Sequence, residues 1–185
     1  MRDGFSTISR RAVFPGPRAA FTLPKRPRPR VFLDLDGVMA DFDAYFPALF
    51  GVDHRDLADD VMWEQITSAG TFFRDMPVCP GALDFFDDLK ALNVPVSILT
   101  ACPKSNYAHV ATQKREWVRE HLGTDVTVIP TAGGTAKPLF MHAAGDILID
   151  DFDRNCASWA KAGGLGIHHT GAFWHTFQLL QEALA

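Results

Sequence analysis

The sequence predicts an α/β protein with a doubly wound parallel sheet. From residue 31 onward, short apolar segments alternate with segments of helical periodicity, which is typical of parallel sheets covered by helices. Two of the apolar segments end directly in paired aspartates, Asp34 with Asp36 and Asp150 with Asp151. The chain has 185 residues and is 47% hydrophobic, enough for one substantial core with a small inserted subdomain.

Each element follows from its local pattern. Five short apolar segments have strand composition, at residues 31–35, 94–100, 126–129, 147–150 and 166–168. Four segments have helical spacing, at residues 80–92, 106–122, 153–162 and 172–184. In the first of these helices the repeat is carried by Leu83, Phe86, Leu89 and Leu92. Ligands of such sheets bind beyond the carboxyl ends of the strands, so we expect the paired aspartates and Thr100 to meet there.

Three regions differ in composition. Residues 31–40 and 80–185 form the predicted α/β core, and residues 41–79 form an aromatic-rich helical cap inserted after the first strand. Residues 1–30 carry a net charge of +7 and five prolines, which predicts a disordered basic tail. A start codon placed too early and an organellar transit peptide are the alternatives for this segment.

Bulk properties limit the partners. The remainder of the chain carries a net charge of −11, which disfavours a nucleic acid polymer as partner. No apolar run approaches the roughly 18 residues of a membrane span, so we expect a soluble protein without a membrane partner. The odd number of cysteines, without C-x-x-C spacing, predicts free thiols in a reducing compartment and hence a cytoplasmic protein, or an organellar one if the tail is a transit peptide.

Four signals indicate chemistry at the strand ends. They are Asp34-x-Asp36-Gly37, Thr100 at the end of an apolar strand, Lys137 in a glycine-rich stretch, and the Asp150-Asp151 pair. Each alone has a structural explanation, such as a turn, a good strand former, a surface charge or a helix cap. Together they supply acids for a hard cation, a hydroxyl and an ammonium group, which favours metal-assisted phosphoryl transfer.

These four signals resemble the four motifs of the haloacid dehalogenase-like phosphohydrolases, over roughly residues 31–170. Further segments resemble the 5′(3′)-deoxyribonucleotidase group of that superfamily. They include the run at residues 34–42, Phe72-Phe73-Arg74 followed by Met76-Pro77, the segment from Lys114 to Gly123, residues 146–155, and Trp159 through Gly164.

The resemblance implies a mechanism. Asp34 is the expected nucleophile that forms an aspartyl-phosphate, and Asp36 the expected general acid and base. Mg²⁺ is expected on the Asp34 carboxylate, the Asp36 backbone carbonyl and Asp151. Asp150 is expected to orient the metal ligands without binding Mg²⁺ itself. Asp150 and Asp151 are adjacent, so the opposite assignment of these two roles is the alternative.

The remaining motif residues have supporting roles by the same resemblance. Thr100 and Lys137 are expected to bind the oxygens of the transferred phosphoryl group, and Asn155 to support the site. In the cap, Phe42 matches the position of an aromatic residue against the nucleobase, with Trp63 and Phe73 as further candidates. Ordinary core packing is the alternative for these rings.

Arg74 is the last candidate of the substrate pocket. It could contact a nucleotide, but a surface salt bridge with Asp75 or Glu64 is an equally good explanation.

Several functions remain open at this point. The expected substrate is a nucleoside monophosphate, and sugar phosphates or other small phosphomonoesters are the main alternative. A catalytically silent nucleotide-binding protein is a further alternative, although every chemical position is filled. A phospho-accepting receiver domain is disfavoured because its acid pair precedes the acceptor strand, whereas here the pair comes last. The oligomeric state is open, with a homodimer as one candidate.

Overall fold

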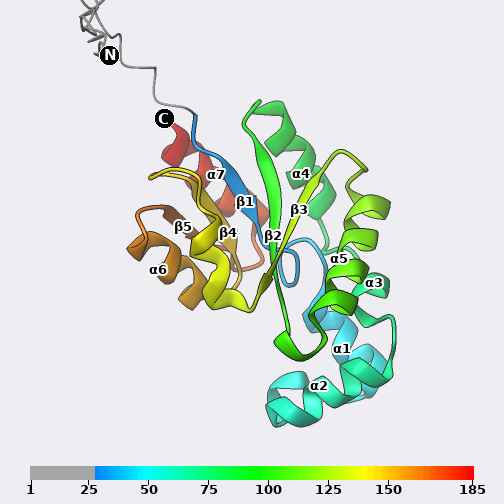
Figure 1. Cartoon of the computed structure of the whole chain (residues 1–185). Coiled ribbons are helices and arrows are strands. Elements are labelled where there is room, and N and C mark those ends of the chain that lie inside the picture. Colours follow the sequence, from blue (N-terminus) through cyan, green and yellow to red (C-terminus); the bar gives the residue numbers. More distant parts are fainter. Residues whose placement is uncertain (1–27) are drawn as a thin grey trace, which may run out of the picture.

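The computed structural model describes residues 28–185, so most of the predicted basic tail lies outside the described residues. A five-stranded parallel sheet forms the centre, in the order β3-β2-β1-β4-β5 (Figure 1). The strands are β1 (Val31–Leu33), β2 (Val96–Cys102), β3 (Thr127–Ala132), β4 (Ile147–Asp150) and β5 (Leu165–His168). The predicted α/β class with a parallel sheet is confirmed.

The alternation of side chains along β1 builds two core layers. Val31 and Leu33 face one layer, whereas Phe32 between them faces the other, as the two-residue period of a strand requires. Helices α4 (Ala82–Ala91), α5 (Tyr107–His121) and α7 (Phe173–Leu184) supply buried residues to the first layer. Helix α6 (Asp153–Lys161) covers the second through Trp159, whose ring lies 5.2 Å from that of Phe32.

Helix α4 is present where helical spacing was predicted, and it begins at Ala82, after Gly81 in the left-handed conformation. Its buried face is formed by Ala82, Phe85, Phe86 and Leu89. Of the predicted repeat, Phe86 and Leu89 are therefore buried, whereas Leu83 is 43% exposed.

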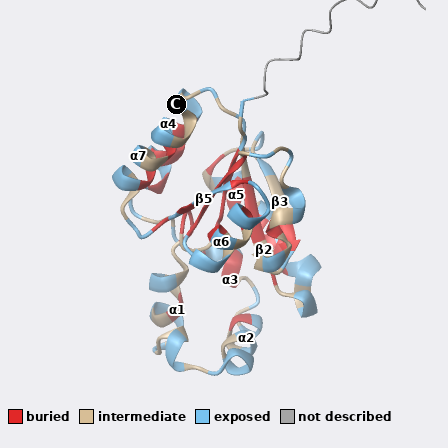
Figure 2. Cartoon of the chain, turned by 90° about the vertical axis from the view of Figure 1, so that its left-hand side faces the viewer, coloured by how far each residue is buried: buried red, intermediate tan, exposed pale blue. Residues whose placement is uncertain are grey.

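Residues 41–79 hold four helical segments between β1 and β2. These are α1 (Phe42–Phe50), η1 (His54–Asp56), α2 (Asp59–Ser68) and α3 (Phe72–Asp75). Helices α1 and α2 project beyond one end of the sheet and are mostly exposed (Figures 1 and 2). The two linking segments pair with each other, since the Asp41 amide donates to Pro77 O and the Cys79 amide to Met39 O. The division into cap and core remains our interpretation of this arrangement.

Two further features predicted from the sequence concern membrane spans and cysteines. Within residues 28–185, no helix has the length and apolarity needed to cross a membrane. The three cysteines, Cys79, Cys102 and Cys156, are all free.

Two short 3-10 helices connect strands to the elements that follow them. They are η2 (Lys104–Asn106), between β2 and α5, and η3 (Gly134–Phe140), between β3 and β4.

Candidate active site

The site begins at the end of β1, the middle strand of the sheet. The Asp34 amide continues the ladder by donating to Ile149 O at 2.8 Å, so its carboxylate emerges at the carboxyl edge of the sheet. There the Asp34 Oδ1 atom accepts from the Leu35 amide at 2.8 Å and from Lys137 Nζ at 2.9 Å. Two donors therefore fix the orientation of a carboxylate that is only 7% exposed.

Lys137 is a fully buried ammonium group at the centre of two acids. It lies in η3, and its Nζ contacts Asp150 Oδ2 at 2.5 Å as well as Asp34. Burial alone would lower the pKa of Lys137, but the carboxylates of Asp34 and Asp150 outweigh it and raise the pKa. The group therefore stays charged, and its position depends on both neighbours.

Asp150 is held by four hydrogen bonds. Its Oδ1 accepts from the Phe152 amide at 2.9 Å and Asn155 Nδ2 at 3.0 Å, and its Oδ2 accepts from Lys137 and from Asn155 Nδ2 at 3.1 Å. Gly134 is needed beside Asn155, because a Cβ at this glycine would lie 2.5 Å from Asn155 Oδ1. The carboxylate of Asp150 is thus occupied by the protein itself.

Asp151 has a different environment. Its carboxylate rests on Gly37, where a Cβ would lie 2.2 Å from Oδ2, and it borders an open cavity of about 490 Å³. Burial and the nearby charges of Asp34, Asp150 and Asp36 raise the pKa of Asp151 to about 8. Oxygens of Asp34, Asp150 and Asp151 lie within 4.8 Å of one another. An acid cluster of this kind is strongly repulsive without a cation.

Asp36 pairs with Lys114, which was not among the predicted site residues. Lys114 is fully buried in α5, and its Nζ donates to Asp36 Oδ2 at 2.5 Å, Thr100 Oγ1 at 2.9 Å and Ala101 O at 2.6 Å. Burial raises the pKa of Asp36, and its Oδ1 atom is buried without a hydrogen-bond partner within residues 28–185. The site therefore has two ammonium groups, one on each side of Asp34 and Asp36.

A helical pattern could have revealed Lys114. Val110, Trp117 and Val118 lie on the buried face of α5, and Lys114 lies four residues after the first and four before the last. A lysine on the apolar stripe of a helix must find a buried partner.

Comparison with known proteins shows the family. Residues 28–175 match the model of the 5′ nucleotidase, deoxy (pyrimidine), cytosolic type C family. The chain belongs to this nucleotidase family. A human protein named "5′(3′)-deoxyribonucleotidase, cytosolic type" is 32% identical over 150 residues, which cover 67% of this chain and 71% of the human one. A Bordetella pertussis protein whose name assigns it to the 5′(3′)-deoxyribonucleotidases is 32% identical over 143 residues, covering 65% and 73%.

Solved structures agree on the fold. A haloacid dehalogenase-superfamily hydrolase from Ehrlichia chaffeensis superposes with a TM-score of 0.52 at 13% identity, covering 87% of this chain and all of that one. A hydrolase of the same family from Deinococcus radiodurans, solved with bound phosphate and sodium, gives 0.51 at 14% identity, covering 86% and 97%. The family match and the relatives confirm the predicted likeness to the deoxyribonucleotidases and show a phosphohydrolase, and the two solved structures show that its fold is that of haloacid dehalogenase-like hydrolases.

The structure does not bring the four predicted pocket residues of this nucleotidase together. The Phe42 ring packs inside the cap against Phe46, His54 and Phe72, with ring centroids 5.1–5.9 Å apart. Arg74 is exposed and pairs with Asp75 at 2.9 Å, which is the salt bridge considered as its alternative.

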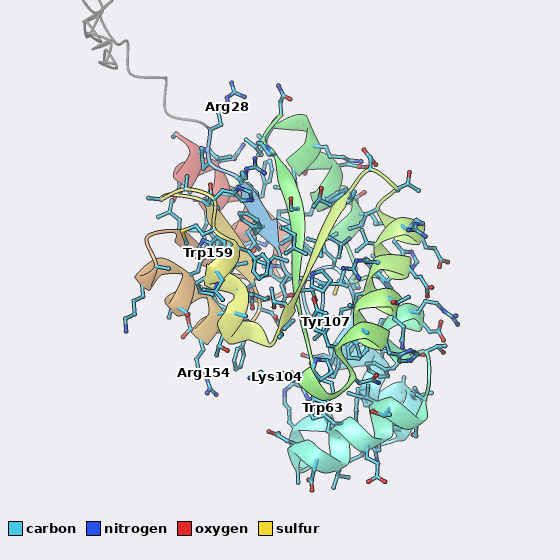
Figure 3. All side chains as sticks on the ribbon, viewed as in Figure 1. Arg28, Trp63, Lys104, Tyr107, Arg154 and Trp159 are labelled. Carbon is cyan, nitrogen blue, oxygen red and sulfur yellow. The ribbon has the colours of Figure 1, made fainter. Side chains whose placement is uncertain are left out.

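Trp63 and Phe73 are the two candidates that meet. Their ring centroids are 6.5 Å apart, and both border a cavity of about 30 Å³ between α2 and the loop after β2. Figure 3 labels Trp63 in α2 and Lys104 in the loop after β2, and Pro103 and Ser105 of this loop line the cavity together with Trp63. Only Phe73 also reaches the acid site, because Lys114 Nζ lies 4.7 Å from the centre of its ring.

Proposed function

We propose that this protein is a Mg²⁺-dependent 5′(3′)-deoxyribonucleotidase that dephosphorylates nucleoside monophosphates through an aspartyl-phosphate on Asp34. The observation that carries the proposal is the pairing of Asp34 with Lys137 and of Asp36 with Lys114 just after the end of β1. Family membership supports the reaction class, and the names of the human and Bordetella relatives support the substrate class.

The two acids divide the chemistry. Asp34 attacks phosphorus in line, so that a bond from its carboxylate oxygen forms as the bond to the leaving oxygen breaks. Asp36 gives its proton to that leaving oxygen. A water molecule then attacks phosphorus, Asp36 takes the water's proton, and inorganic phosphate leaves with Asp34 restored as a carboxylate. Burial raises the pKa of Asp36, whereas the Lys114 ammonium acts in the opposite direction.

The cations and the hydroxyl act on charge and position. Lys137 holds Asp34 and Lys114 holds Asp36, and the two ammonium groups would offset charge on the phosphoryl oxygens. Thr100 accepts from Lys114, so its hydroxyl proton is left to donate to a phosphoryl oxygen. The dry surroundings strengthen each of these interactions.

The acid cluster fits a hard divalent cation. The Asp34 and Asp151 carboxylates and the Asp36 backbone carbonyl would hold Mg²⁺, whereas the four hydrogen bonds to Asp150 support its role as an orienting group. When bound, Mg²⁺ would offset charge on the phosphoryl oxygens. Without a cation, the cluster leaves the pKa of Asp151 at about 8, and relief of this repulsion favours binding.

The remaining features of the function are also proposals. The free cysteines and the printed name of the human relative support a cytoplasmic location. The substrate is a small phosphomonoester, and a homodimer remains a prediction. Among the four predicted pocket residues, Phe73 has the best-supported role in substrate binding, because its ring lies against Lys114, which holds Asp36.

A phosphate-release screen tests the proposal. Deoxyribonucleotides, ribonucleotides and sugar phosphates are compared with and without Mg²⁺, for the wild type, Asp34→Asn and Asp88→Asn as an exposed control in α4. We expect Mg²⁺-dependent release with nucleoside monophosphates preferred, lost only in Asp34→Asn. Activity that survives Asp34→Asn contradicts the mechanism, and a preference for sugar phosphates contradicts the substrate assignment alone.

A further inference from the structure

Helix α5 is joined to the end of the cap by three side chains. His109, Gln113 and Trp117 follow one another at four-residue intervals and therefore share a face of the helix. His109 Nε2 bonds with Gly70 O at 2.9 Å, and Trp117 Nε1 donates to Met76 O at 2.8 Å. Between them, Gln113 makes two bonds to the same cap segment.

Gln113 is the buried member of this set that reaches Phe73. It is 5% exposed, its Oε1 accepts from the Phe73 amide at 3.0 Å, and its Nε2 donates to Gly70 O at 2.9 Å. Gly70 O keeps His109 as a second partner, whereas the side-chain bond to the Phe73 amide comes from Gln113. Loss of Gln113 therefore leaves a buried amide without its acceptor.

Phe73 connects this bond to the acid site. Its ring lies under the Lys114 ammonium, 4.7 Å from Nζ, and Lys114 directs its bonds to Asp36, Thr100 and Ala101 O. A cation over an aromatic face is attracted to it, and the attraction grows where water is excluded. The place of the Phe73 ring thus affects where Lys114 holds Asp36.

We propose that Gln113 is a positioning residue for the phosphatase reaction. By fixing the backbone at Phe73, it seats the ring against Lys114 and thereby aligns Asp36 with the leaving oxygen. The inference rests on the proposed role of Asp36 as general acid. It assigns a functional role to a residue that touches no substrate and lies outside the four motifs.

The chemistry of the leaving group separates this role from a merely structural one. A nucleoside alkoxide needs a proton from Asp36, whereas p-nitrophenolate is a stable anion that leaves without one. Misalignment of Asp36 must therefore slow a deoxynucleoside monophosphate more than p-nitrophenyl phosphate. General loss of folded enzyme slows both equally.

The experiment measures KM and the single-turnover rate of leaving-group release, which precedes hydrolysis of the aspartyl-phosphate, for both substrates in the Mg²⁺-loaded enzyme. For Gln113→Leu we expect this rate to fall about tenfold on the nucleotide and at least about fivefold less on p-nitrophenyl phosphate, with KM for each nearly unchanged. Gln113→Glu keeps an acceptor for the Phe73 amide and should restore the nucleotide rate. His109→Ala removes the other bond to Gly70 O and should leave the ratio of the two rates at the wild-type value.

Equal losses on the two substrates, or a selective loss in His109→Ala, would overturn the proposal. If Gln113→Leu does not fold, Phe73→Leu provides the test, because removal of the ring must give the same selective loss, and an equal loss contradicts the inference. Asp36→Asn distinguishes the underlying function: if it slows the single-turnover release of both leaving groups equally, the acid role of Asp36 fails irrespective of Gln113.

Discussion

The ammonium group of Lys114 has its acceptors arranged in three directions, and two of them belong to the candidate site. Asp36, Thr100 and a backbone carbonyl surround it, and its side chain is completely buried. Loss of one partner leaves a buried ammonium uncompensated, which costs folding free energy. The position of Lys114 therefore depends on all three acceptors. Lys114 therefore serves both to hold Asp36 and to add positive charge beside Asp34.

Replacement of Lys114 by methionine tests this role. Methionine keeps most of the side-chain volume but removes the charge and the bonds to Asp36 and Thr100. We expect Lys114→Met to lower kcat by about 100-fold or more, the size of the loss when one preorganised donor is removed from an active site. Lys90→Met is the matched control, because Lys90 is exposed on α4, where it pairs with Asp87 and lies over the Phe86 ring, away from the candidate site. A Lys114→Met enzyme with a wild-type rate would contradict the assignment.

At the scale of elements, the turn after β1 lies directly against the Asp151 carboxylate, which follows β4. Gly37 adopts φ +76°, and the Asp151 carboxylate occupies the space where a side chain would begin. The turn after β1 and the end of β4 are thus in direct contact, and each sets the position of the other's acids. The glycine is required twice, for its backbone conformation and for this contact.

Substitution of Gly37 by alanine separates these two requirements. Gly51 has φ +74° with nothing within 4 Å of an added Cβ, so Gly51→Ala carries the backbone cost alone. Both variants should lose about 1–2 kcal/mol of unfolding free energy, as expected for an L-residue in the left-handed region. Only Gly37→Ala should also lose Mg²⁺-dependent phosphate release, because it displaces Asp151. Equal activity in the two variants would show that Asp151 is not required where it lies.

The elements differ in how far the sequence could predict them. The ends of β1 and β4 were predictable, because apolar runs that stop at paired acids mark both the strand and its edge. The substrate pocket was not predictable, because the packing of aromatic residues in the cap depends on contacts between distant segments. Phe72 and Phe73 are adjacent and both buried, yet only Phe73 contacts Lys114. Periodicity gives no information about which of the two turns toward the site.

At the scale of the whole molecule, the acid cluster links folding to pH. Burial and neighbouring acids raise the pKa of Asp151 from 3.8 to about 8 in the folded chain without a cation. Between these values the folded chain binds more protons than the unfolded chain. Its free energy of unfolding therefore falls as the pH rises through this window. A bound cation should remove this cost, since it replaces the proton as the partner of the carboxylate.

Thermal unfolding with and without Mg²⁺ measures this linkage. The increase in Tm caused by Mg²⁺ should be larger at about pH 8.5 than at about pH 6, because protons compete with the cation at the lower pH. Asp151→Asn should remove most of the dependence, and Asp153→Asn, in the first turn of α6, should not. A Mg²⁺ effect of the same size at both pH values would contradict the proposed cation site.

The proposed mechanism depends on Asp34 becoming covalently phosphorylated, and trapping the intermediate tests this most directly. The enzyme is quenched with acid during turnover of a radiolabelled deoxynucleoside monophosphate, and the labelled peptide is identified. We predict label on the peptide that contains Asp34, released by hydroxylamine as expected for an acyl phosphate, and none in Asp34→Asn. Turnover without any trapped label, or label on a different residue, would contradict the account.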